Sequence, residues 1–106
     1  MDNVKVVPEL TNYKATATFY DESGAAVTPV GAVSYRVVDA ATGTVVVAET
    51  PITVSSSSVD ITIAAAYNTC ISSGSQIEYR QLIVKAAGLA QVEHVYAVNR
   101  VPGRIA

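Results

Sequence analysis

Short runs of alternating residues dominate this chain, and turn residues interrupt them about every ten positions, at the spacing of an all-β domain. A third of the residues are branched at Cβ: 18 valines, 7 isoleucines and 10 threonines, against three leucines. Such side chains have restricted χ1 angles and suit a pleated strand better than a helix. No strand–helix–strand rhythm is present. The pattern therefore predicts an all-β fold, an antiparallel β-sandwich of about seven strands.

Alternation marks the expected strands, and turns or breakers separate them. The expected strands are 13–20, 32–39, 44–49, 59–63, 76–86 and 90–101. Turns are expected at 21–24, 40–43 and 87–89, where glycine accompanies small or polar residues. We expect 27–30 to continue the first strand after a bend, and Pro51 to break the strand before it. The alanine-rich window 64–68 predicts one short helical crossover between the sheets.

The strand at 76–86 contains a change of phase. Ile77 and Tyr79 occupy one face of the strand, whereas Leu82 and Val84 occupy the other. One extra residue in a strand would shift the alternation in this way. The sequence therefore predicts a β-bulge near residues 80–81.

The length of 106 residues is that of one domain. We divide the chain into an N-terminal arm or edge strand (1–12), the sandwich (13–101) and a C-terminal tail (102–106). Half of the residues are hydrophobic and only 15% are charged, which is lean for a fully solvated surface. We therefore expect other proteins to cover part of this surface, because exposed apolar patches mark association sites.

Charge and hydropathy exclude several classes of partner. The net charge is −2 and the basic residues are scattered, apart from Arg100 and Arg104, so no nucleic-acid partner is expected. The apolar runs are too short to cross a bilayer, and no signal peptide is visible at the N-terminus. Cys70 is the only cysteine, so no internal disulfide can form. We expect synthesis and folding in a cytoplasm.

No catalytic, cofactor-binding or metal-binding constellation is visible. His94 is the only histidine, and its phase in the strand indicates a structural residue with a satisfied ring nitrogen. Cys70 lacks an obvious base and is interpreted as a small buried thiol. Asp21 and Glu22 are interpreted as turn residues, because a hard-cation site needs more oxygens from spaced positions. The chain is therefore expected to be no enzyme and to hold no metal or cofactor.

Five segments form a recognisable series of strand and turn patterns: 17–29 (ATFYDESGAAVTP), 32–39 (AVSYRVVD), 42–44 (TGT), 59–63 (VDITI) and 96–100 (YAVNR). In this order, they resemble small Ig-like structural proteins of tailed bacteriophages and prophages. The likeness covers residues 15–101 and consists of strand and turn patterns rather than catalytic residues. The chain departs from the family pattern in two places: Asn99 precedes Arg100, and the N-terminal arm has no counterpart.

The resemblance implies an Ig-like sandwich with a non-enzymatic role in a virion. The first expectation is a capsid decoration or cement protein on the outside of the shell, and a head–tail connector or tail component is the alternative. The implied partners are the major capsid protein or other virion proteins, with a homo-oligomer, no nucleic acid and no membrane. The implied location is the virion, after synthesis in the host bacterial cytoplasm.

The terminal segments are the predicted contact sites, since apolar arms and bare strand edges allow strand addition. The predicted partner-binding residues are Val4, Val6, Val7, Val101, Arg104 and Ile105. The alternative interpretation is that both termini are frayed ends. A role of another class, an Ig-like carbohydrate- or receptor-binding adhesion module, would use exposed aromatic residues, with Tyr20 and Tyr67 as candidates.

Overall fold

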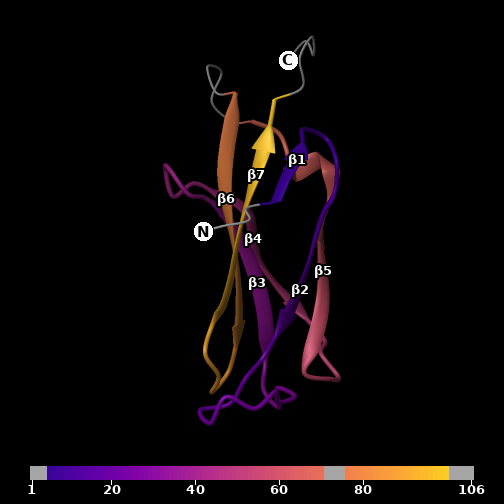
Figure 1. The fold of residues 1–106 in the computed structure, drawn as a ribbon, viewed down its shortest axis with the longest axis vertical. Helices are drawn as coiled ribbons and strands as arrows, with labels where there is room; N and C mark the ends of the chain where they lie inside the picture. The colour runs from indigo at the N-terminus through magenta and orange to yellow at the C-terminus, as the bar shows by residue number, and fades with distance from the viewer. Residues whose placement is uncertain (1–4, 71–75, 101–106) are drawn as a thin grey trace.

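The computed structural model describes residues 5–70 and 76–100. Within them, strands and one short 3₁₀ turn make up the regular structure (Figure 1). The elements are β1 (Lys5–Pro8), β2 (Tyr13–Thr18), β3 (Val33–Asp39), β4 (Val45–Ile52), β5 (Ser58–Ile63), η1 (Ala65–Tyr67), β6 (Ile77–Ala86) and β7 (Val92–Asn99).

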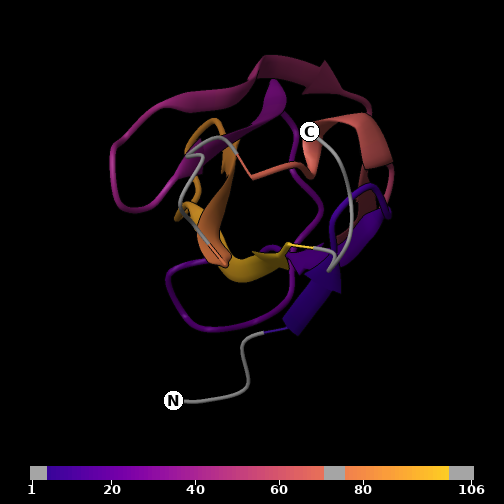
Figure 2. The same cartoon turned by 90° about the horizontal axis from the view of Figure 1, so that it is seen from above.

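The strands form two sheets that face each other (Figure 2). The larger sheet has the order β1-β7-β6-β3-β4, and β2 pairs with β5 in the smaller one. All pairs are antiparallel except β1 with β7. The turn η1 carries the chain from β5 in one sheet to β6 in the other. The predicted Ig-like β-sandwich of about seven strands with one short helical crossover is confirmed.

Alternation in β2 and its extension places one phase of side chains between the sheets. Tyr13, Ala15, Ala17 and Phe19 are all buried in the core, whereas the intervening residues face outward. Opposite them, the inward residues of the larger sheet complete one hydrophobic cluster. Its buried members there are Val7, Val33, Val37, Val47, Leu82, Val84, Ala86, Tyr96 and Val98.

The prediction that 27–30 continues the first strand is wrong. The backbone N–H of Val27 donates to the carbonyl of Phe19 at 2.9 Å, so the chain folds back on the end of β2. Asp21 causes the reversal, because its Oδ1 accepts hydrogen bonds from backbone groups of the turn. Gly24 closes the turn with a φ of +87°, which a residue with a Cβ rarely adopts.

The prediction that Pro51 breaks its strand is also wrong. Pro51 lies inside β4 and pairs with Ser34 of β3. β4 is the edge of the larger sheet, so the missing N–H of Pro51 leaves no neighbouring strand without a donor. The irregularities of register lie instead in the β3–β4 pairing, on either side of Val37.

The predicted β-bulge near residues 80–81 is absent from β6. The register of β6 with β7 runs without a shift from Ile77 opposite Asn99 to Val84 opposite Val92. Its register with β3 is equally regular. The apolar phase changes for another reason: along the first part of β6, charged side chains occupy the inward positions.

Candidate functional site

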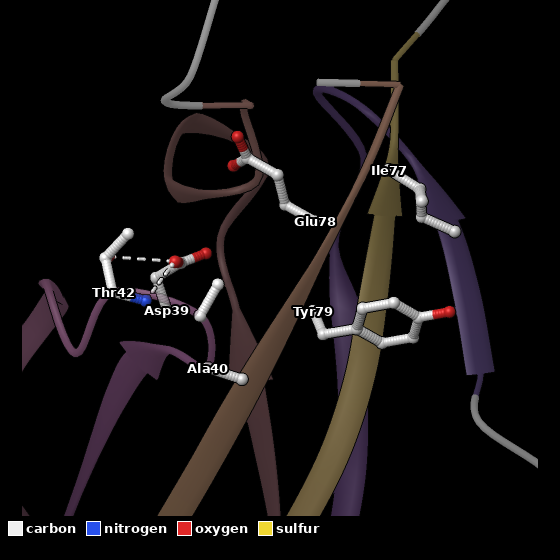
Figure 3. A pocket seen from close by; sticks show the side chains of 7 residues that line it. Asp39, Ala40, Thr42, Ile77, Glu78 and Tyr79 are labelled. Carbon is white, nitrogen blue, oxygen red and sulfur yellow. Dashed lines mark hydrogen bonds between the residues drawn. The ribbon is translucent and has the colours of Figure 1, made fainter. Parts of the chain in front are cut away.

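Strand β6 of the larger sheet has two halves of opposite polarity, which meet at its middle. In the first half, Glu78 and Arg80 point inward, whereas Ile77 and Tyr79 point outward. Figure 3 shows Glu78 on one side of the strand and Ile77 and Tyr79 on the other. We call residues 77–81 of β6, with the residues paired to them, the inverted half. Residues 82–86 and their partners form the regular half, which is apolar inside and charged outside.

Arg80 is the centre of the interior of the inverted half, and its side chain is fully buried. Its Nη2 donates to Oε1 of Glu78 at 2.9 Å, and its Nε lies 3.5 Å from Oδ1 of Asp39. The same guanidinium donates to the carbonyls of Thr69 at 2.6 Å and Tyr67 at 3.2 Å. A buried cation is tolerable only with such pairing. Arg80 thereby ties β3, β6 and the end of η1 together.

Asn68 forms a second buried polar contact beside this ion pair. Its Nδ2 donates to the carbonyl of Thr11 at 2.8 Å, and its Oδ1 accepts the hydroxyl of Tyr96 at 2.8 Å. The ring of Tyr96 stacks on that of Tyr13 with 3.8 Å between centroids. Burial raises the pKa of Tyr96 to about 12, so its hydroxyl remains a donor above its ordinary pKa of 10.0.

Cys70 follows Asn68 and is partly buried, as a structural thiol would be. Its backbone N–H donates to Oε2 of Glu9 at 2.7 Å, and Glu9 is itself buried. Burial, followed by the nearby Glu78 and Glu9 carboxylates, raises the pKa of the Cys70 thiol. A raised pKa keeps the sulfur protonated, which is the opposite of what a nucleophile needs.

The prediction of a satisfied ring nitrogen in His94 is wrong. His94 lies on the inward phase of β7, opposite Leu82 of β6. Its Nε2 is buried and has no hydrogen-bond partner within residues 5–70 and 76–100. Leu82, the residue directly opposite, is apolar and offers the ring no acceptor.

The outer side of the inverted half is uncharged and largely apolar across all five strands. Three rows of paired residues make it up: Pro8, Asn99 and Ile77; Val6, Ala97 and Tyr79; Val95, Gln81, Val38 and Val45. None of these ten residues is charged. Among them, Val6, Ile77, Tyr79, Val95 and Val45 keep 41–57% of their surface exposed. We call this surface the outer apolar face.

The outer side of the regular half carries the charges instead. Glu49 accepts a hydrogen bond from Oγ of Ser34 at 2.7 Å and lies 3.6 Å from Nζ of Lys85. The Ser34 hydrogen bond, and next the charge of Lys85, lower the pKa of Glu49. Glu93 accepts from Nε2 of Gln81 at 2.8 Å. These side chains form a solvated polar surface of the usual kind.

The outer surface of the smaller sheet is polar as well. Oδ1 of Asp60 accepts from Thr16 at 2.6 Å, and its Oδ2 lies 3.7 Å from Nζ of Lys14. The hydroxyls of Thr18 and Ser58 lie 2.9 Å apart. The outer apolar face therefore distinguishes the larger sheet from the smaller one.

A pocket of about 380 Å³ borders the outer apolar face (Figure 3). It lies between the β3–β4 hairpin and the start of β6, where the pairing of these strands ends at Asp39 opposite Arg80. Its lining residues are Asp39, Ala40, Ala41, Thr42, Ile77, Glu78 and Tyr79. Oδ2 of Asp39 is engaged by the backbone N–H and hydroxyl of Thr42, at 3.1 and 2.9 Å. Both acidic side chains of the pocket are thus engaged within the protein: Asp39 by Thr42 and Arg80, and Glu78 by Arg80.

The predicted contact residues fall in different places. Val6 is half exposed on the outer apolar face, whereas Val7 is buried in the core, because successive residues of β1 face opposite ways. The remaining predicted residues, Val4, Val101, Arg104 and Ile105, lie outside the described residues. Sequence reasoning missed Ile77, Tyr79 and Val95. The phase change in 76–86 was the available signal for two of them.

The aromatic candidates for an adhesion role lie far apart. Tyr67 belongs to η1, directly beyond the Ile63 end of β5, and Tyr20 follows the opposite end of β2. Both are about half exposed, but they do not share one platform.

Two other features are absent from the described residues: a metal-binding cluster and a membrane-spanning helix. Within 5–70 and 76–100, no three His, Cys, Asp or Glu side chains are grouped to hold a metal ion. No helix in the same part of the chain is long and apolar enough to span a membrane. Comparison with protein-family models, with curated proteins and with solved structures finds no match to the chain.

Proposed function

We propose that this chain is a non-enzymatic structural protein of a tailed-phage virion, and that it decorates or cements the outside of the capsid shell. The observation that carries the proposal is the outer apolar face, a set of ten uncharged residues on paired strands, of which five large hydrophobic ones are 41–57% exposed. Large exposed apolar surfaces on soluble domains mark sites of association with other proteins.

The sandwich supports such a face well. Each exposed residue stands on a paired strand, and the buried Arg80 ion pairs hold the β3–β6 end of the sheet from beneath. A surface that is ordered before it binds loses little conformational entropy on association. The low content of charged residues, 15%, fits a chain whose surface is partly covered in its working state.

A non-enzymatic role is supported by the state of the ionisable groups. Arg80, Asp39 and Glu78 contact one another, and Glu9 contacts the backbone of Cys70. Groups with these contacts hold the fold together and are poorly placed to accept or donate protons to a substrate. The virion as the setting is supported by the resemblance of segments 17–29, 32–39, 42–44, 59–63 and 96–100 to phage Ig-like structural proteins.

Cosedimentation with purified virion parts tests the proposal. The chain is titrated onto empty shells assembled from the major capsid protein of the same phage, and in parallel onto isolated tails. Saturable binding to shells, with a fixed number of copies per capsomer, is the expected result. Shells of an unrelated phage serve as the control and are expected to bind none.

Two outcomes would decide against the proposal. Saturable binding to tails, without binding to shells, would move the chain to the tail or the head–tail junction. Binding to neither part would remove the virion role altogether.

A further inference from the structure

We propose that a second copy of this chain binds the outer apolar face and buries it. In this dimer, the outer sides of the two larger sheets pack face to face around a two-fold axis that runs along β6. The inference deepens the assembling role proposed above and rests on it. It identifies both the partner on this face and its orientation.

The first argument is the polarity of the inverted half. Its charged residues, Arg80, Glu78 and Asp39, already point inward and are paired there. Its apolar residues consequently point outward. Tyr79, the largest of them, leaves about half of its surface in water. Burying such a ring stabilises a complex substantially, since aromatic residues contribute most at the centre of interfaces.

The second argument is area. With strands about 4.8 Å apart and a rise of about 3.4 Å per residue, five strands beside the ten residues of β6 form a face of about 800 Å². A stable protein interface buries about 800 Å² on each partner. The outer apolar face is about half of this surface, so a stable dimer needs the regular half as well.

The third argument is the charge pattern of the regular half. One row of its outer side consists of Glu93 on β7, Ile83 on β6 and Arg36 on β3. A two-fold axis along β6 places β7 of one copy over β3 of the other. Glu93 then lies opposite Arg36 of the second copy, twice in each dimer, and the two Ile83 side chains meet at the axis. Opposite charges that face each other in this way determine orientation.

The alternative face-to-face arrangement is unfavourable. An axis across the strands would place the inverted half of one copy over the regular half of the other. Arg36 would then lose water to apolar residues such as Tyr79, without gaining Glu93 of the other copy as a partner. Taking a charge out of water without a partner is unfavourable. Lys85 keeps its own Glu49 at 3.6 Å in either arrangement, because that ion pair lies within one copy.

Sedimentation equilibrium of the full chain tests the dimer over a range of concentrations. We expect a reversible monomer–dimer equilibrium. Tyr79→Ser is expected to raise the dissociation constant about 30-fold, the equivalent of about 2 kcal/mol for a central aromatic residue. The matched control is Tyr20→Ser, which removes an equally exposed tyrosine away from the face and should leave dimerisation unchanged. A wild-type chain that remains monomeric at about 100 µM, well above the micromolar range of weak specific complexes, would overturn the proposal.

Charge reversal tests the axis. Arg36→Glu and Glu93→Arg should each weaken the dimer about tenfold, because each change sets like charges opposite each other across the axis. The double variant restores opposite pairs and should dimerise within about threefold of wild type. Both single variants should retain the wild-type circular dichroism spectrum. Weakening without rescue in the double variant would overturn the proposed axis.

The same samples separate this inference from the proposed function. Wild-type protein that stays monomeric but binds shells would overturn the dimer and leave the decoration role standing. Dimeric wild-type protein that binds no shells or tails would overturn the virion role and leave the dimer standing.

Discussion

The two halves of β6 are built from the same kind of strand and opposite chemistry. In residues 82–86 the inward side chains are apolar, with Leu82 and Val84 fully buried, and Lys85 faces water. In residues 77–81 the inward side chains are Glu78 and Arg80, and the outward ones are largely apolar. Neither half disturbs the regular pairing of the strand with its neighbours.

The difference teaches that a sheet can hold a reversed patch if both of its sides find partners. On the inside, the partners are the Asp39 and Glu78 carboxylates and the carbonyls of Tyr67 and Thr69, which compensate the Arg80 charge. On the outside, the partner that we propose is a second copy of the chain. The reversed patch thus couples a structural ion pair to an exposed, largely apolar surface.

Removing the central cation should have the largest effect on stability. Arg80→Met removes the cation beside the buried Asp39 and Glu78 carboxylates, and we expect a loss of about 3–5 kcal/mol in the free energy of unfolding. Urea denaturation followed by circular dichroism measures it. In the double variant Arg80→Met with Glu78→Met, one of the two carboxylates that lose the Arg80 charge is removed as well, so the loss should be smaller. A loss below about 1 kcal/mol for the single variant would contradict the account of the inverted half.

The regular half should respond to lost packing instead of lost charge. Leu82→Ala removes a fully buried side chain and is expected to reduce the free energy of unfolding by about 3 kcal/mol through transfer and cavity costs. The same urea titration measures it. Since no ion is uncovered, the loss should be independent of salt. A strong salt dependence would show that the two halves are less distinct than their contacts indicate.

High pH should weaken the inverted half through Tyr96. Its folded-state pKa is raised to about 12 against an ordinary value of 10.0, so above pH 10 the unfolded chain loses this proton before the folded one does. The contribution to stability is fully present below pH 10 and is lost as the pH rises through 12, a change of about 3 kcal/mol. Urea titrations at a series of alkaline pH values measure it.

Tyr96→Phe is the control for this dependence. It removes the hydroxyl that Asn68 accepts, at a cost of about 1 kcal/mol near neutral pH, and should flatten the alkaline decline. The neighbouring Tyr13, whose pKa burial also raises, keeps its own contribution. An unchanged decline in the variant would show that another group is responsible.

The smallest effects on stability are expected from substituting two isoleucines on the same outward phase of β6. Because one lies in each half, comparing them tests the difference between the halves most directly. Ile83→Thr, at a nearly buried position, should cost about 1–2 kcal/mol in unfolding free energy. Ile77→Thr, at a position that is 41% exposed, should cost less than about 0.5 kcal/mol in dilute monomeric protein. Thermal unfolding at low protein concentration measures both. Equal losses would mean that the outer apolar face is already covered within the monomer.

Much of the architecture follows from local pattern. The alternation in 13–20 and 32–39, the hairpin at 40–43 and the crossover at 64–68 were predicted from the sequence and are present. Backbone conformation at such positions depends on short-range effects: β-branched side chains, an Asp that accepts hydrogen bonds from its own turn, and glycines at positive φ. The tertiary arrangement explains why Pro51 is tolerated inside β4: this strand is an edge of the larger sheet.

The candidate site depended on long-range contacts. Alternation divides β6 into two faces, but it does not say which face meets the core where a charged phase and an apolar phase compete. Burying Arg80 became possible because β3 brings Asp39 beside it and η1 turns two carbonyls toward it. Those partners lie far from Arg80 along the chain or in another element. A strand's periodicity thus reveals its two sides, whereas the pairing energy of remote residues selects the side that is turned inward.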